Sequence, residues 1–223
     1  DDAFPLDVFQ TGSGTSTNMN ANEVIANLAS KASKLSIDAN DDVNMSQSSN
    51  DVIPTAICIS ALIDMHRLLL PNLDILIKSI DTKMLKLKGK VKTGRTHLMD
   101  AMPIDFSQEL SGWKAQLEAS KRSLVTATNR MNELSQGGTA IGTGINSHKD
   151  FSKNFCIQVN QVSKLKTKPA KNFFQGLSSV DNAVELSSAL KNLSIVLMKI
   201  SNDLRWMNSG PLTGLGEIEL EAL

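Results

Sequence analysis

Apolar residues recur at intervals of three and four along most of the chain. This spacing puts apolar side chains on one face of an α-helix. The most regular stripes are Leu73, Leu76, Ile80, Met84 and Leu87; Phe106, Leu110, Trp113 and Leu117; and Leu190, Leu193, Leu197, Ile200 and Leu204. The pattern predicts an all-α fold, in which long helices pack nearly parallel in a bundle.

Short sequence motifs predict where two helices start, and they predict no strands. Pro71 suits the first turn of a helix, because the backbone N–H that it lacks would have no partner there. Asn20 followed by Glu23 resembles a capping box and predicts a helix from Asn20 toward Leu35. No strand is predicted, because the chain has no tyrosine, few β-branched runs and no Asn-Gly hairpin turn.

Five breaks between the predicted helices are rich in small and hydroxylated residues. They cover residues 11–22, 40–51, 94–103, 137–146 and 209–216. Connections between helices are usually short and use whatever turn residues suffice. The first three breaks carry more hydroxyl and amide groups than a turn requires, which favours a role in binding.

Charge and cysteine content exclude several classes of function. The chain has 23 Lys plus Arg and 23 Asp plus Glu among 223 residues, so no net field favours nucleic acid or an anionic membrane. No apolar run approaches 18 residues, so no membrane-spanning segment is predicted. Cys58 and Cys156 match no metal-ligand spacing, and no paired histidines or acidic clusters do either. Neither a metal nor another cofactor is expected.

The first break can bind an anion with neutral donors. Its glycines allow a close approach of the backbone, and Ser13, Thr15 and Asn18 can donate hydrogen bonds to carboxylate oxygens. It lacks the Gly-Lys-Ser/Thr ending of a phosphate-binding loop. The alternative is a serine-rich loop that only caps the next helix.

The second and third breaks add a helix terminus and a histidine. Ser49 or Asn50 can cap the helix that follows, and the same geometry can bind an anion at the helix N-terminus. Thr96 and His97 lie in the third break, where a histidine can exchange protons near neutral pH. Alternatively this break is a plain helix connection. Together the three breaks indicate a small polyanionic substrate with a histidine at hand.

Five ordered segments of the chain resemble the aspartase/fumarase superfamily, and most closely the class II fumarate hydratases. They are QTGSGTSTNMNANEVIANLAS, NDDVNMSQSSNDVIPTA, VKTGRTHLMDAMP, GGTAIGTGIN and MKISNDLRW with the following SGPLTGLGEI. Thr96-His97 stands where aspartases typically carry Thr-Gln. Ser111, Gly112 and Trp113 are also similar to fumarases. Aspartase remains the alternative within the superfamily.

The resemblance implies a lyase that reversibly hydrates fumarate to (S)-malate without a redox or metal cofactor. It implies a homotetramer with active sites shared among subunits, located in the cytoplasm, or in the mitochondrial matrix of a eukaryote. Ser13 and Thr15 would bind a substrate carboxylate from one subunit. The second subunit would contribute Ser48, Ser49 and Asn50, and the third would contribute Thr96 and the catalytic His97.

The resemblance also shows departures. The family's Gly-Ser-Ser loop, which carries the base serine, would follow Leu223, so this chain alone is expected to be inactive. Residues 1–47 would end an N-terminal lyase domain, and residues 48–223 would belong to the central helix bundle. An accessory carboxylate site, usually His-Pro-Asn-Asp, is similar to residues 38–41, where Asn40 and Asp41 carry over but Asp38 replaces the histidine. A helical scaffold without activity is the non-enzymatic alternative.

Overall fold

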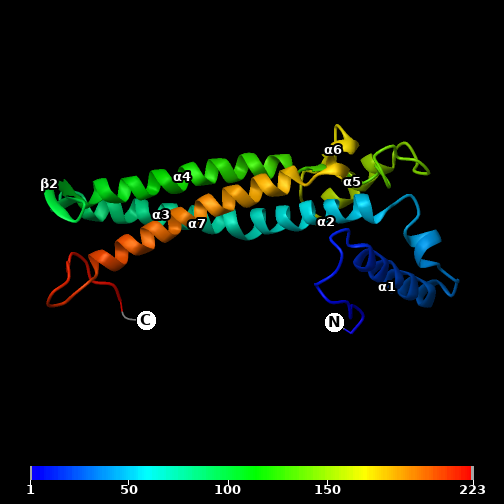
Figure 1. Ribbon diagram of the computed structural model, residues 1–223, viewed down its shortest axis with the longest axis horizontal. Coiled ribbons are helices and arrows are strands. Elements are labelled where there is room, and N and C mark those ends of the chain that lie inside the picture. The colour runs from blue at the N-terminus through cyan, green and yellow to red at the C-terminus, as the bar shows by residue number, and fades with distance from the viewer. Residues whose placement is uncertain (1, 222–223) are drawn as a thin grey trace. The chain divides into compact units, whose positions relative to one another are not determined.

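The computed structural model describes residues 2–221, so the chain ends Asp1 and Leu223 lie outside the described residues. Helices dominate the described chain, which confirms the predicted all-α class (Figure 1). The α-helices are α1 (Thr15–Ser33), α2 (Ser49–Asp64), α3 (Leu70–Leu87), α4 (Phe106–Arg130), α5 (Phe151–Ser163), α6 (Phe173–Ser178) and α7 (Asp181–Met207). Two π-helical turns, η1 (Ala39–Val43) and η2 (Met65–Leu69), precede α2 and α3.

Two small strand pairs were not predicted. Strands β1 (Val91–Thr96) and β2 (Met99–Asp105) form an antiparallel hairpin. Strands β3 (Glu133–Leu134) and β4 (Lys168–Pro169) form a short parallel pair. Neither pair has the alternating apolar pattern of a buried sheet, which explains why periodicity did not reveal them.

The chain divides into two compact units, each made of two segments. Unit 1 contains residues 1–64 and 129–184, and unit 2 contains residues 65–128 and 185–223. The boundary expected between residues 47 and 48 lies inside unit 1. The assignment of residues 1–47 and 48–223 to two lyase domains therefore stays a prediction.

In unit 2 the predicted stripes of α3, α4 and α7 supply the core. Leu117 is fully buried, and Leu73 and Leu193 are nearly so. Two polar contacts join the helices at the edge of this core. Lys114 of α4 pairs with Asp81 of α3 at 2.5 Å, and the Trp113 indole of α4 donates to Asp203 of α7 at 3.0 Å. Tertiary packing of the apolar faces stabilises these helices more than local propensity does.

In unit 1 helix α1 begins five residues earlier than the capping-box pattern predicts. Its first residue is Thr15, preceded by Gly14 in the left-handed region at φ 65°. A Cβ at Gly14 would lie 2.7 Å from the Ile53 side chain. The prediction of a start at Asn20 was wrong because a glycine, and not an Asn–Glu pair, sets where this helix begins.

One helical run among the described residues, Ser49–Leu87, is long and apolar enough to cross a membrane, with a mean hydropathy of 1.5 in its most apolar window. Core helices of bundles have the same length and composition. The expectation that the protein has no membrane partner therefore stays a prediction.

Candidate functional site

The hydroxyl groups of the first and second breaks meet in unit 1. Ser13 Oγ lies 3.3 Å from Thr15 Oγ1, and Ser49 Oγ donates to the same Thr15 oxygen at 3.3 Å. Thr11 Oγ1 extends the chain of contacts to Ser13 at 3.0 Å. Ser13 and Thr15 are exposed and Ser49 is half-buried, so their hydroxyls can turn toward a bound anion.

This contact corrects one expectation about subunits. The resemblance implied that Ser49 reaches Ser13 and Thr15 from a second subunit. The structure joins Thr15 and Ser49 within one chain. Two of the three predicted groups of substrate ligands therefore form without a second copy, because α1 and α2 begin side by side in unit 1.

Ser48, and not Ser49 or Asn50, caps helix α2. Its hydroxyl accepts from the Asn50 backbone N–H at 3.2 Å, and its own N–H donates to Asp51 Oδ1 at 2.9 Å. The two bonds form a variant of the capping box, in which aspartate replaces glutamate and the serine hydroxyl accepts from the second residue of the helix. They fix Ser49 and Asn50 in the first turn, where the positive end of the helix dipole favours an anion.

Asp51 is a buried carboxylate that joins two loops of unit 1 by hydrogen bonds. It is fully buried, and its second oxygen accepts from the backbone N–H groups of Gly137 at 3.0 Å and Thr139 at 2.8 Å. Burial raises the pKa of this carboxyl, although hydrogen bonds from Ser48, Gly137 and Thr139 act in the opposite direction. The Asp51 carboxylate therefore connects the second break, residues 40–51, to the fourth break, residues 137–146.

Amide side chains add further hydrogen bonds between the loops of unit 1. The buried Asn18 and Asn22 of α1 both donate to Asn44 Oδ1, at 3.2 and 3.0 Å. Asn50 donates through its side chain to the Ala140 carbonyl at 2.8 Å. The buried Asn18 and Asn22 hold one arrangement of the loops, because each broken bond there would leave a costly unpaired group, whereas Asn50 is exposed.

A pocket of about 310 Å³ lies against the hydroxyl cluster. Ser13, Ser49 and Asn50 line one part of it, and residues 176–180 at the end of α6 line another. Ile53 and Ile57 of α2 add apolar wall. No sequence signal pointed to residues 176–180, because a Gly-Leu-Ser-Ser-Val stretch more than 120 positions beyond Asn50 resembles an ordinary turn.

Thr96 and His97 belong to unit 2, on the turn between β1 and β2. Thr96 pairs with Met99, so His97 and Leu98 form a two-residue loop, with φ of 52° and 63°. Two successive left-handed residues define a type I′ turn, which usually uses Asn or Gly. The break is therefore a hairpin and not a plain helix connection. Holding these two residues costs about 1 to 2 kcal/mol each, and such strain clusters at functional sites.

The proposed accessory site holds an internal carboxylate. Asp38 accepts from the backbone N–H groups of Asn40 at 2.7 Å and Asp41 at 2.8 Å. The side chains of Asn40 and Asp41 bond each other at 3.1 Å. An external carboxylate would compete with Asp38 for the same donors, so the geometry counts against anion binding by Asn40 and Asp41.

Asp38→Ala is expected to lower stability at neutral pH and to have little effect in acid. Hydrogen bonds from Asp41 and Asn40 lower the pKa of Asp38 below its ordinary value. A carboxyl with a lowered folded-state pKa contributes stability above its unfolded pKa and loses it as the pH falls through the folded pKa. The thermal unfolding midpoints of the unmodified protein and of Asp38→Ala should therefore converge as the pH is lowered from 7 to 2. A constant difference over this range would contradict the assignment.

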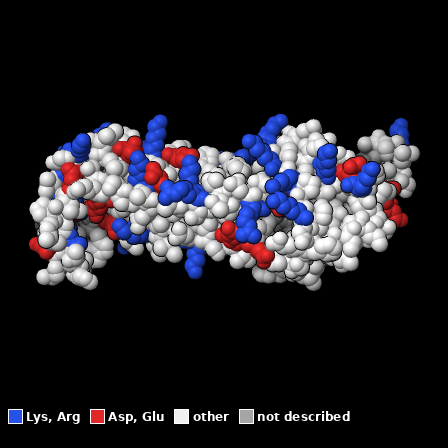
Figure 2. Space-filling view, turned by 90° about the horizontal axis from the view of Figure 1, so that it is seen from above, with Lys and Arg blue, Asp and Glu red and all other residues white. Residues whose placement is uncertain are grey.

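Charged side chains form no metal cluster among residues 2–221, where no group of three or more His, Cys, Asp or Glu is placed to hold an ion. On the face seen in Figure 2, acidic and basic side chains are intermixed. In the unit 1 pocket a small ligand would meet the hydroxyl groups of Ser13 and Ser49 and the amide of Asn50.

Helices α1 and α2 present hydroxyl-rich loops at a small pocket in unit 1, which defines the chain as a helical protein with a small polar site. The family model described as lyase matches residues 1–223, and the chain belongs to that family.

Curated relatives within the family confirm the resemblance to class II fumarate hydratases. The chain is 52% identical over 220 residues to fumarate hydratase class II 2 of Pseudomonas aeruginosa, covering 99% of this chain and 48% of the relative. It is 53% identical over 223 residues to the class II enzyme of Xylella fastidiosa, covering 100% of this chain and 47% of the relative. The chain spans about half the length of the curated relatives it matches.

Solved structures agree with the fold. The chain superposes on the recombinant class II fumarase of Schistosoma mansoni with a TM-score of 0.93 at 38% identity, covering 96% of this chain and 49% of that one. It superposes on the cobalt-bound fumarate lyase:delta crystallin of Brucella melitensis with a TM-score of 0.91 at 40% identity, covering 98% and 48%.

Proposed function

We propose that the whole protein containing this chain reversibly hydrates fumarate to (S)-malate. The observation that carries the proposal is the pocket at which the Ser13 and Ser49 hydroxyls and the Asn50 amide meet. These neutral donors suit the carboxylate of a small dicarboxylate. About 50% identity to class II fumarate hydratases over the full chain supports the same substrate.

In the proposed reaction one water molecule adds across the double bond of fumarate. Its hydroxyl group bonds to one alkene carbon, and a proton bonds to the other. Ser13, Thr15 and Ser49 bind a carboxylate, on which negative charge develops when malate loses its carbon-bound proton. Donors aimed at developing charge supply much of the rate in such reactions. His97 orients the water-derived group and exchanges its proton, while a separate base removes the carbon-bound proton of malate.

We also propose that the active protein is a homotetramer. Exposed apolar side chains on the long helices support this proposal. Ile75 and Leu85 of α3 are 63% and 74% exposed, and Ile195 and Met198 of α7 are 50% and 60% exposed. Several exposed apolar side chains on long helices are consistent with helix faces that another subunit covers.

Purified whole protein is expected to consume fumarate without added metal, measured as loss of the double-bond absorbance, and to retain this activity after treatment with a chelator. The same preparation in a sedimentation experiment gives the oligomeric state. His66→Gln is a suitable control, because His66 is exposed in η2 and outside the pocket.

The alternatives predict different results. An aspartase would release ammonia from L-aspartate, and it would consume fumarate only when ammonia is present, giving aspartate and not malate. An inactive scaffold would do neither and would still fold. Loss of activity with chelator would contradict the proposed chemistry.

A further inference from the structure

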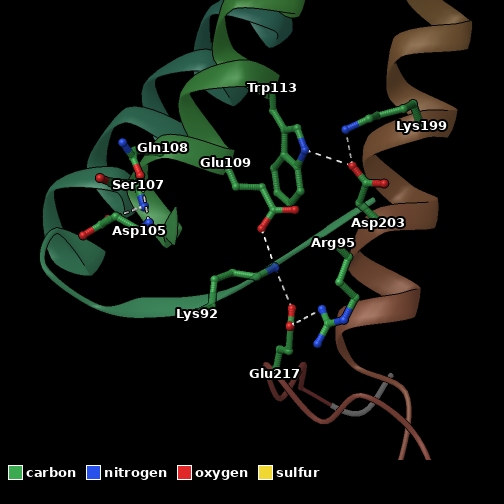
Figure 3. A network of polar contacts seen from close by, with 10 residues as sticks. All are labelled: Lys92, Arg95, Asp105, Ser107, Gln108, Glu109, Trp113, Lys199, Asp203 and Glu217. Carbon is green, nitrogen blue, oxygen red and sulfur yellow. Dashed lines mark hydrogen bonds and ion pairs between the residues drawn. The ribbon is translucent and has the colours of Figure 1, made fainter. Parts of the chain in front are cut away.

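A network of ion pairs holds strand β1 from the side opposite its solvent face (Figure 3). Glu217, in the segment after α7, pairs with Lys92 at 2.6 Å and with the Arg95 guanidinium. Lys92 also pairs with Glu109 of α4 at 2.6 Å. The side chains of Lys92 and Glu217 are only 7% and 10% exposed, so these pairs are shielded from solvent more than ordinary surface pairs.

A bulge in β2 lies opposite the part of β1 between Lys92 and Arg95. In a regular strand, side chains three positions apart point to opposite faces. Thr93 pairs with Pro103 and Arg95 pairs with Asp100, so the single residue Gly94 of β1 faces both Ala101 and Met102 of β2. A Cβ at Gly94 would lie 2.6 Å from the Met102 carbonyl oxygen. A bulge increases the local twist of the strand pair, and at this irregular part of the hairpin the Glu217 carboxylate reaches both Lys92 and Arg95.

Hydrogen bonds also hold the backbone of Glu217 in place. Its backbone N–H donates to the Met207 carbonyl at 2.8 Å, and the N–H groups of Ile218 and Gly216 donate to Met207 and Ser209. Burial by itself raises the pKa of Glu217, but the hydrogen bonds and charges of Lys92 and Arg95 outweigh this effect and lower it. Glu217 is thus an ionised anchor on a fixed backbone at neutral pH.

The hairpin needs such an anchor. An isolated two-stranded hairpin is marginally stable in water. The turn at its tip holds His97 and Leu98 at positive φ, a conformation that persists only when the surroundings impose it. Arg95 lies two residues before His97, so a contact at Arg95 acts directly on the turn.

We propose that Glu217 is a positioning residue that holds the Thr96–His97 turn through Lys92 and Arg95. This inference rests on the proposed function, in which His97 handles the water-derived group. Glu217 touches no substrate in this arrangement, so its effect on the reaction passes through His97.

The test is a double-mutant cycle in the whole protein, with Glu217→Gln, His97→Asn and the double variant. Glu217→Gln is expected to lower kcat for fumarate hydration by about 10- to 100-fold with a change in KM below about threefold, because misplacing a catalytic group by an ångström costs this much. In the His97→Asn background the same change is expected to alter kcat less than about twofold, since no histidine is left to position.

A matched control is Asp74→Asn, which removes the ion pair of Asp74 with Lys121 in the same unit, away from the hairpin. It is expected to leave kcat unchanged in both backgrounds. Should Glu217→Gln not fold by circular dichroism, Glu217→Asp replaces it, because it keeps the charge and shortens the reach by one methylene.

Two results overturn the proposal alone, namely full kcat in Glu217→Gln beside an impaired His97→Asn, and an equal loss of kcat on Glu217→Gln in both backgrounds. The second result would show that Glu217 only stabilises the fold. Full kcat in His97→Asn overturns both this proposal and the role of His97 in the proposed function.

Discussion

Replacing His97 by asparagine is expected to lower kcat for fumarate hydration by about 10²- to 10⁴-fold, the range that a positioned acid or base contributes. Asparagine is chosen because it tolerates the positive φ of 52° that His97 adopts in the type I′ turn. The hairpin should therefore keep its shape while the proton-exchanging group is lost. Initial rates of fumarate consumption at saturating substrate measure the effect.

Two further variants of the protein serve as a control for this experiment and as a test of substrate specificity. His66→Gln, at an exposed histidine of η2, should retain full activity. His97→Gln, which installs the residue typical of aspartases, separates loss of hydration from a gain of aspartate deamination. An unchanged kcat in His97→Asn, with the helical circular dichroism intact, would remove His97 from the mechanism.

Replacing Asp51 by alanine is expected to destabilise the protein by roughly 3 to 5 kcal/mol. The carboxylate accepts from three backbone N–H groups, of Ser48, Gly137 and Thr139. Each donor left unpaired in the interior costs about 1 to 3 kcal/mol, and relief of the buried charge offsets part of the total. The shift of the urea unfolding curve measures this loss.

The same substitution should weaken substrate binding. Without Asp51 the capping box that fixes Ser49 and Asn50 opens, so KM for fumarate is expected to rise by about tenfold, or 1.4 kcal/mol. Asp38→Ala is the matched control in unit 1, because that carboxylate also accepts from two backbone N–H groups but is exposed. If Asp51→Ala and Asp38→Ala destabilise the protein equally, burial of Asp51 is not what makes it important.

The composite nature of the site follows from these contacts. Thr15 and Ser49 come from two helix starts and bond each other, and Asp51 binds a loop almost 90 residues further along the chain. Sequence could identify each of the two hydroxyl-rich breaks as a candidate, because serine and threonine exceed what a turn needs. It could not tell which breaks meet within one chain, and the assignment of Ser49 to another subunit was wrong for this reason.

Local patterns predicted least well where tertiary contacts override them. Helix α1 starts at Thr15 because Gly14 packs against Ile53, a contact that no spacing within residues 11–23 encodes. The hairpin around His97 uses a turn without glycine or asparagine and depends on Glu217, more than 100 positions away, for its anchor. Turn rules based on residue type could not detect it.

By itself, the sequence determined the helical class, the three long core stripes and the membership of the superfamily, because helix periodicity and contiguous motifs are local along the chain. The bonding of Asp51 to residues 137 and 139, the pocket wall at residues 176–180 and the clamp of Glu217 on β1 were decided only by the tertiary structure. Each of these joins residues far apart in sequence, and the free energy of such contacts depends on burial and distance, which no local pattern carries.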